Sequence, residues 1–348
     1  MKYRSTIAKI HKWLGLFILV FLLIQTISGL ILLFREEIIV YDQSDDQYEN
    51  TISLGEALEA LAPQSQVVRI DYDAAGDSPA IFRISRGEDI EFYTLAKGPG
   101  GSFEVAHSSR AKVLEQIFHF HHDILSGDIG RLILAACATG LIINLILGLI
   151  LWWRRGIPLR KALAVKQSAP PQRYWFELHK ASGAIFSVLL LLTAITGLGL
   201  ALTPELRPSF SVSLPPVDPL PQTDRTSLDP SRLEAIARQA FPSQKLRDVR
   251  FTKTAFLPYR FLFKPSSDFK SRPPGQILLD PFTGATIWRS DQDESTAGAT
   301  LAWLYPLHTK FGLGEIGRVI LILSAVGYLL VLLSAFYLWS IRRSRKRT

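Results

Sequence analysis

Four long apolar stretches dominate the pattern of hydrophobic and polar positions along the chain. They cover residues 13–34, 132–153, 181–202 and 319–339. None of these stretches contains a charged residue, and each is long enough to cross a hydrocarbon core of about 30 Å as a helix. The pattern therefore predicts a membrane protein with four spanning helices.

The two long polar segments between these stretches have the patterns of small α+β modules. A helix is predicted over 51–66, with Thr51 or Ser53 as its cap, and a second over 231–241. Apolar–polar alternation predicts strands at 67–73, 80–87, 91–96, 249–254, 259–265, 276–280 and 285–290. Seven of the twenty prolines lie between Pro204 and Pro230, which predicts an extended linker ahead of the second module.

Basic residues orient the chain in the membrane. They are in excess in the segment up to Lys12, in the segment 154–180 and after Ile341, and such excess marks the cytoplasmic side. Both termini and the central loop are therefore expected in the cytoplasm, and the first apolar stretch is expected to stay as a signal anchor. The net charge of +8 reflects this topology, so we expect the lipid bilayer as a partner and no nucleic acid.

Cysteine and methionine are almost absent. Cys137 and Met1 are the only residues of their kinds, which excludes disulfides, cysteine-based zinc sites, iron–sulfur clusters and covalently attached haem. A metal centre must therefore use histidine, carboxylate or carbonyl ligands.

Two sequence patterns occur twice. HKWLGLFILVFLLIQTISGL from His11 aligns with HKASGAIFSVLLLLTAITGL from His179, and HHDILSGDIGR from His121 aligns with HTKFGLGEIGR from His308. The chain therefore reads as two parallel repeats, each with a histidine at both ends of its membrane part. This placement is typical of a site for electron transfer across a membrane.

The predicted fold class is a membrane α-helical protein: a four-helix bundle built from two parallel repeats, with two small α+β modules outside. The segments are 1–34 (cytoplasmic N-terminus and first span), 35–131 (first module), 132–153 (second span), 154–180 (cytoplasmic loop), 181–202 (third span), 203–318 (proline-rich linker and second module) and 319–348 (fourth span and basic tail).

Several motifs resemble one family. LLDPFTGATI resembles the strand–turn–strand of PepSY modules, and HKWLG and LHTKFGLGEIGR, each before a span, resemble the motifs of PepSY-associated transmembrane proteins. The resemblance runs from about residue 4 to residue 343. It implies PepSY-like modules in the periplasm, a place in the bacterial inner membrane, and kinship with ferric-siderophore reductases that carry b-type haems.

Parallel repeats are usually related by an axis along the membrane normal. His11 is then expected to face His179 near the cytoplasmic side, and His121 to face His308 near the outer side. Since a b-type haem takes two imidazoles from facing helices, the pattern and the resemblance together predict two b-type haems. For a single histidine, a place among lipid headgroups would be the simpler interpretation.

Other residues near the spans leave alternatives open. His119 and His122 are alternative ligands at the outer site, while Arg131 and Arg318 are candidates for pairing with haem propionates or for snorkelling to the interface. Gln25, Asn144, Ser28 and Thr196 are interpreted mainly as helix-packing groups. The glycines of the first and third spans admit either a flat macrocycle or a neighbouring helix; they are Gly15, Gly29, Gly183 and Gly197.

The resemblance implies a haem-dependent oxidoreductase that reduces a ferric siderophore in the periplasm and so releases Fe(II). No dinucleotide-binding fingerprint or P-loop is present, so a membrane quinol or a separate cytoplasmic reductase must supply the electrons. A non-catalytic PepSY protein that regulates periplasmic proteases, and a metal-binding protein that uses the HFHHD cluster, remain alternatives.

Overall fold

The computed structural model describes residues 2–40, 52–61, 66–72, 78–86, 89–97, 102–153, 156–209, 219–220, 226–251, 257–264, 275–290 and 296–344. The chain forms two compact units. The helical unit comprises residues 1–33, 117–206 and 303–348, and the sheet unit comprises residues 34–116 and 207–302.

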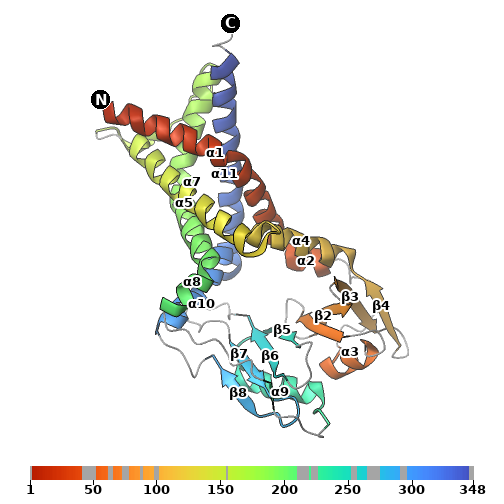
Figure 1. Ribbon diagram of the computed structural model, residues 1–348. Coiled ribbons are helices and arrows are strands. Elements are labelled where there is room, and N and C mark those ends of the chain that lie inside the picture. Colours follow the sequence, from red (N-terminus) through yellow and green to blue (C-terminus); the bar gives the residue numbers. More distant parts are fainter. Residues whose placement is uncertain are drawn as a thin grey trace. The chain divides into compact units, whose positions relative to one another are not determined.

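Four long helices build the helical unit (Figure 1). They are α1 (Lys2–Leu32), α5 (Gly127–Trp152), α7 (Pro171–Ala201) and α11 (Gly314–Ser344). All four are long and apolar enough to cross a membrane, so the four predicted apolar stretches are helices that are candidate spans. Each helix is longer than its apolar stretch because polar turns continue it at one or both ends.

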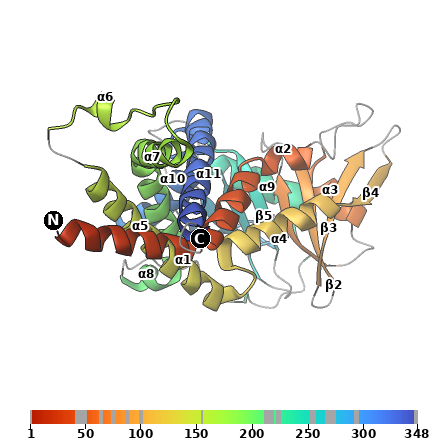
Figure 2. The same ribbon diagram turned by 90° about the horizontal axis from the view of Figure 1, so that it is seen from above.

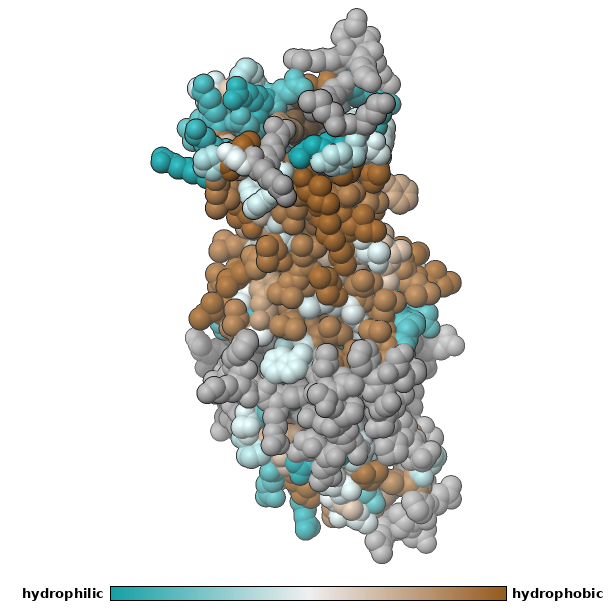
Figure 3. Space-filling view, turned by 90° about the vertical axis from the view of Figure 1, so that its left-hand side faces the viewer, coloured by the Kyte–Doolittle hydropathy of each residue, from teal (hydrophilic) through white to brown (hydrophobic). Residues whose placement is uncertain are grey.

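The long helices pack around an apolar centre. Helices α1 and α7 each contact α5 and α11, and Figure 2 shows α7 beside α11. The buried cluster between them is Ile18, Leu19, Leu22, Leu190, Tyr328 and Leu332. The outer surface of the unit is apolar as well, and Figure 3 shows it as a band of hydrophobic residues. Such an all-round apolar helix surface is typical of a membrane span.

Shorter helices join the long ones. They are α4 (Ser109–Asp123), α6 (Leu159–Ala162), α8 (Thr203–Ser209) and α10 (Thr296–Lys310). Helix α8 corrects the prediction of an extended linker from Pro204, because proline is tolerated in the first turn of a helix, where its missing N–H is not needed. Residues 210–218 and 221–225 of the predicted linker lie outside the described residues.

The sheet unit contains one antiparallel sheet of eight strands, in the order β4-β3-β2-β1-β5-β6-β7-β8. The strands are β1 (Gln66–Tyr72), β2 (Pro79–Arg86), β3 (Asp89–Lys97), β4 (Phe103–His107), β5 (Leu246–Arg250), β6 (Tyr259–Phe263), β7 (Gln276–Leu279) and β8 (Thr286–Arg289). All of them were predicted except β4, although β5 begins earlier than expected.

The two predicted modules share this one sheet. Strands β1 and β5 pair antiparallel, with Ile70 opposite Val249 at the middle of the ladder. The modules are therefore joined edge to edge, which the separate strand patterns did not predict.

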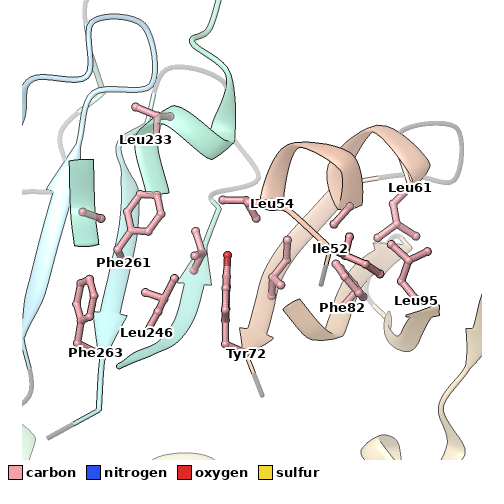
Figure 4. Packing of buried hydrophobic residues seen from close by; sticks show 14 of the residues in the cluster. Ile52, Leu54, Leu61, Tyr72, Phe82, Leu95, Leu233, Leu246, Phe261 and Phe263 are labelled. Carbon is pink, nitrogen blue, oxygen red and sulfur yellow. The ribbon is translucent and has the colours of Figure 1, made fainter. Parts of the chain in front are cut away.

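The apolar core lies on one face of the sheet, under α3 (Leu54–Leu61) and α9 (Pro230–Ala240). Phe82 and Phe261 from the strands and Leu233 from α9 are fully buried there (Figure 4). Ser53 caps α3 as predicted, since its N–H and the N–H of Glu56 are each bound by the other residue's side chain. A further short helix, α2 (Arg35–Val40), belongs to the same unit.

Candidate functional site

His11 and His179 face each other within the helical unit. Their ring centres are 6.4 Å apart, and the ring planes are inclined at 61°. Nδ1 of His11 donates to the carbonyl of Asn144 on α5 at 3.0 Å, and Nδ1 of His179 donates to the carbonyl of Val331 on α11 at 3.1 Å. The two hydrogen bonds come from matching positions of the two halves of the sequence.

His121 on α4 and His308 on α10 form a second pair with the same separation. Their ring centres are also 6.4 Å apart, at an inclination of 46°. Nδ1 of His121 lies 3.0 Å from the hydroxyl of Ser28, and Nδ1 of His308 donates to the carbonyl of Thr193 at 3.1 Å. Thr196, which aligns with Ser28 in the sequence, places its hydroxyl 3.2 Å from Nδ1 of His308.

These contacts fix the tautomer of all four rings. A carbonyl oxygen only accepts, so the Nδ1 atoms of His11, His179 and His308 carry the proton. The hydroxyl of Ser28 donates to the carbonyl of Gln25 and therefore accepts from Nδ1 of His121. In each neutral ring Nε2 keeps its lone pair, which is the form in which histidine binds a metal.

Burial favours the neutral form of both rings of the His121–His308 pair. Burial, and then the neighbouring His308, lower the pKa of His121 to about 3. Burial also lowers the pKa of His308. A proton on either ring would remove the Nε2 lone pair, so these shifts keep both rings available as ligands.

The separation within each pair fits two axial ligands of one metal ion. A metal–imidazole bond is about 2 Å long, and the ring centre lies about 1 Å behind the nitrogen, so opposed ligands have ring centres about 6 Å apart. Both observed separations are 6.4 Å. The donor set, two neutral imidazoles with oriented Nδ1 atoms, is the set that a b-type haem uses.

Helix α1 relates the two pairs in space. It carries His11 itself and Ser28, the hydrogen-bond partner of His121. At about 1.5 Å per residue these positions are roughly 25 Å apart along the helix. The pairs therefore lie at opposite ends of the apolar part of the helical unit.

Tight turns hold α4 and α10 against the spans that follow. Ile124 and Leu125 have φ angles of 52° and 57°, and the aligned Phe311 and Gly312 have 48° and 70°. Left-handed residues end a helix, and both helices end there, two or three residues after the pairing histidine.

A matched glycine follows each of these turns. A methyl group at Gly130 would overlap the carbonyl of Asp123, and one at Gly317 would overlap the carbonyl of Lys310. The last glycine of HHDILSGDIGR and the last glycine of HTKFGLGEIGR thus have a packing reason. Sequence comparison of the two halves matched these glycines without giving that reason.

Span glycines lie against the rings. A methyl group at Gly29 would come within 2.9 Å of Cε1 of His121, and one at Gly197 within 3.0 Å of Cε1 of His308. Gly148 stands in the same relation to His11, at 3.2 Å. The absence of side chains at Gly29 and Gly197 therefore makes room for the histidines, a more specific role than the two predicted alternatives.

The polar residues interpreted as packing groups also contact the histidines. Ser28 and Thr196 contact the outer rings, and Gln25 donates from Nε2 to the carbonyl of His121 at 2.5 Å. The packing interpretation therefore understated their role. Ser28 and Thr196 are 168 residues apart, which is also the shift between His11 and His179. This match could have shown that the two hydroxyls have a common role.

His119 and His122 lie apart from the facing rings. Their Nδ1 atoms are 3.2 and 3.4 Å from Oδ2 of Asp123, and both side chains are about half exposed. Of the three histidines in HFHHD, the structure brings His121 to His308. Within the described part of the chain, no group of three or more His, Cys, Asp or Glu residues is placed to hold a metal ion.

The two matched arginines have partners within the chain. Arg131 is buried and donates to both carboxylate oxygens of Glu205 at 2.7 Å, and also to the carbonyl of Ala201 at 2.5 Å. Arg318 donates to Glu315 at 3.2 Å. The sequence offered Arg131 as a partner for a haem propionate. In the structure its guanidinium already binds a carboxylate, that of Glu205, through two hydrogen bonds.

The structure thus defines a multi-pass membrane protein whose helices carry two facing histidine pairs and whose second unit is a small antiparallel α+β sheet. The sequence model described as the PepSY-associated TM region matches residues 8–342. The chain therefore belongs to the family of PepSY-associated transmembrane proteins. No curated protein matches the sequence.

Proposed function

We propose that this protein is a di-haem oxidoreductase of the bacterial inner membrane. It carries electrons from the cytoplasmic side to the periplasm and reduces a ferric siderophore, which releases Fe(II) for uptake. In this proposal both termini are cytoplasmic, the two halves are parallel repeats, and the sheet unit is periplasmic.

The observation that supports the proposal best is the matched geometry of the two histidine pairs. Both pairs have ring centres 6.4 Å apart, and every hydrogen bond that the structure gives these four rings is made by Nδ1. Headgroup solvation of interfacial histidines would require neither the common separation nor the common tautomer.

His11 and His179 would hold one b-type haem, and His121 and His308 the other. When bound, such a haem supplies an iron that accepts and gives up single electrons. The protein orients the ligands through the Nδ1 contacts, and the apolar cluster between the pairs, which includes Leu19 and Leu332, keeps water out of the path.

The electron balance defines the donor that is needed. One Fe(III) takes one electron, and a membrane quinol gives two electrons and two protons on oxidation, so one quinol serves two ferric ions. A separate cytoplasmic reductase is the other source. Reduction weakens the binding of iron by hard oxygen ligands, which prefer Fe(III), and so frees the metal.

Spectroscopy of the purified full chain tests the proposal. We expect a Soret band and two haems b per chain in a pyridine haemochromogen assay. Replacing His179 or His308 by Ala should leave one haem per chain, because each removes one axial ligand of one pair. If the purified protein shows no Soret band, the proposal is wrong.

His119→Ala is the matched control, since His119 lies in the same helix as His121 and contacts Asp123 instead of the facing ring. This variant should keep both haems. If it loses the outer haem while His121→Ala keeps it, the outer ligand assignment is wrong. Stopped-flow reoxidation of the reduced protein by ferric siderophores then tests the acceptor.

The alternative functions predict different results. A metal-binding protein that uses the HFHHD cluster would hold copper or zinc, lost on His119→Ala and His122→Ala, and metal analysis would detect it. A non-catalytic regulator of periplasmic proteases would purify with neither haem nor bound metal.

A further inference from the structure

A row of four arginines crosses the middle of the sheet. Arg83 on β2 is directly opposite Arg69 on β1, Arg69 is opposite Arg250 on β5, and Arg250 is opposite Arg260 on β6. Directly opposed like charges destabilise a sheet, so four in succession call for compensating charge. The row lies on the face away from the apolar core, because Ile70, Phe82, Val249 and Phe261 occupy the alternate positions of the same strands.

The described residues supply only part of that compensation. Asp71 pairs with Arg69 and with Arg83, and the buried Asp248 pairs with Arg250 at 2.8 Å and with Arg247 at 2.7 Å. Arg83 also pairs with Glu115. Among the described residues, Arg260 forms no ion pair or hydrogen bond, and the buried Nε of Arg69 has no hydrogen-bond partner.

The charges of these arginines also oppose one another. Burial lowers the pKa of Arg69, and the neighbouring Arg83 and Arg250 lower it further against the effect of Asp71 and Asp248. Burial and Arg250 lower the pKa of Arg260 as well. At Arg83 burial is outweighed by the carboxylates of Asp71 and Glu115, which raise the pKa, so the compensation is weakest at Arg69 and Arg260.

The row lines a cleft with a volume of about 350 Å³. This volume is in the range of small-molecule sites, roughly 300–1,000 Å³. All four arginines face it, and Ile90, Phe251 and Leu278 add apolar surface. The cleft therefore combines several guanidinium groups with walls suited to a carbon skeleton.

We infer that this cleft binds a small ligand with several carboxylate groups, held by Arg260 together with Arg69 and Arg250. Guanidinium groups bind carboxylates through two parallel hydrogen bonds, and neighbouring strands repeat the donors at about 4.8 Å, a spacing comparable to that of carboxylates on a short carbon chain. Inorganic phosphate would leave the apolar walls without contacts.

In combination with the proposed function, the ligand is the acceptor itself, an Fe(III) chelate of a polycarboxylate. That step depends on the proposed function, whereas binding of the free polycarboxylate does not. The two can be distinguished because binding is measured without electron transfer, and haem content is measured on the same samples.

Isothermal titration of the full chain in detergent micelles at low salt tests the inference, with citrate, ferric citrate and inorganic phosphate as probes. We expect citrate to bind and Arg260→Gln to weaken its affinity at least tenfold. Phosphate should bind at least tenfold more weakly than citrate. If ferric citrate binds no better than citrate, the site takes the free acid and the step to the acceptor is wrong.

Arg232→Gln is the matched control, because Arg232 is an exposed arginine on α9, on the opposite side of the sheet. Its affinity for citrate should equal that of the wild type. Arg260→Lys keeps the charge and should bind with intermediate affinity. No citrate binding by the wild-type protein, or equal affinity in Arg260→Gln, would overturn the inference.

Discussion

A single backbone carbonyl distinguishes the surroundings of His121 and His308. His308 donates to the carbonyl of Thr193 and also has Thr196 nearby, while Ser28 is the one partner that the described residues give the ring of His121. The aligned residues Ser28 and Thr196 therefore contribute unequally. Such a difference follows from the backbone near His308 and is not visible in the aligned sequences.

This inequality predicts different effects of removing the hydroxyls. Ser28→Ala should lower the affinity of the outer site for haem by about tenfold or more, since loss of a ligand's orienting partner typically costs 10–100-fold. Thr196→Ala should have a smaller effect because the carbonyl remains. Haem retention during titration with apomyoglobin measures both. Equal losses in the two variants would contradict the unequal contributions of Ser28 and Thr196.

At the scale of elements, apolar length predicted the spans well, because a bilayer imposes one requirement on every spanning helix. The edge strand β4 was missed because it is short and mostly exposed, with only Phe103 and Val105 partly buried against the core. The end of α4 was equally invisible: Ile124 and Leu125 adopt left-handed angles that their residue types do not favour.

The histidine pairs were predictable because the same motif occurs twice, while their hydrogen-bond partners depend on how helices pack. Gly29 on α1 meets His121 on α4, for example, across 92 residues of chain. Packing of this kind requires the three-dimensional structure, whereas repetition can be read from the sequence.

Gly29→Ala tests that packing. The added methyl group would come within 2.9 Å of the His121 ring, so we expect the ring to move and the outer haem to be lost or its spectrum to shift. Alanine favours a helix more than glycine by about 1 kcal/mol, so the substitution should not destabilise α1 itself.

Gly140→Ala is the control for this variant, since the added methyl group would meet only Leu14 and Ile18, at 3.7 Å or more. It should keep two haems with unchanged spectra. An unchanged outer haem in Gly29→Ala would contradict the packing role of this glycine.

At the scale of the whole molecule, the sequence predicted a helical part and a strand-rich part. It predicted two separate modules, however, where the structure has one sheet. The strand patterns of the two halves were clear. Neither the sequence of β1 nor that of β5, however, shows which strand it pairs with. What joins them is the fully buried Val249 against Ile70 on one face and, on the other, Arg69, which pairs with both Asp71 and Asp248.

The buried Asp248 makes the joined sheet sensitive to acid. Burial alone would raise its pKa, but Arg247, Arg69 and Arg250 lower it to about 2. Because this value lies below the unfolded value of about 3.9, the stabilisation is complete above about pH 4 and is lost as the pH falls from 4 to 2.

Asp248→Asn should therefore destabilise the sheet unit at pH 7 by about 3 kcal/mol, because it removes the buried charge that pairs with Arg247, Arg69 and Arg250. Circular dichroism melting at pH 7 and at pH 2 measures this. The difference between variant and wild type should shrink at pH 2. Asp128→Asn, which removes a 90% exposed carboxylate, should melt like the wild type, and an equal shift in both variants would refute the assignment.

The pairing of β1 with β5 also sets the timing of assembly during synthesis. About 170 residues separate Tyr72 from Leu246, so at 5–20 residues per second the partner strand emerges on the order of ten to thirty seconds later. Until then the first half-sheet has an open edge along β1, and open edges recruit other strands. The nascent chain thus passes through a period in which it is prone to misassociation, and that period ends when its own second half arrives.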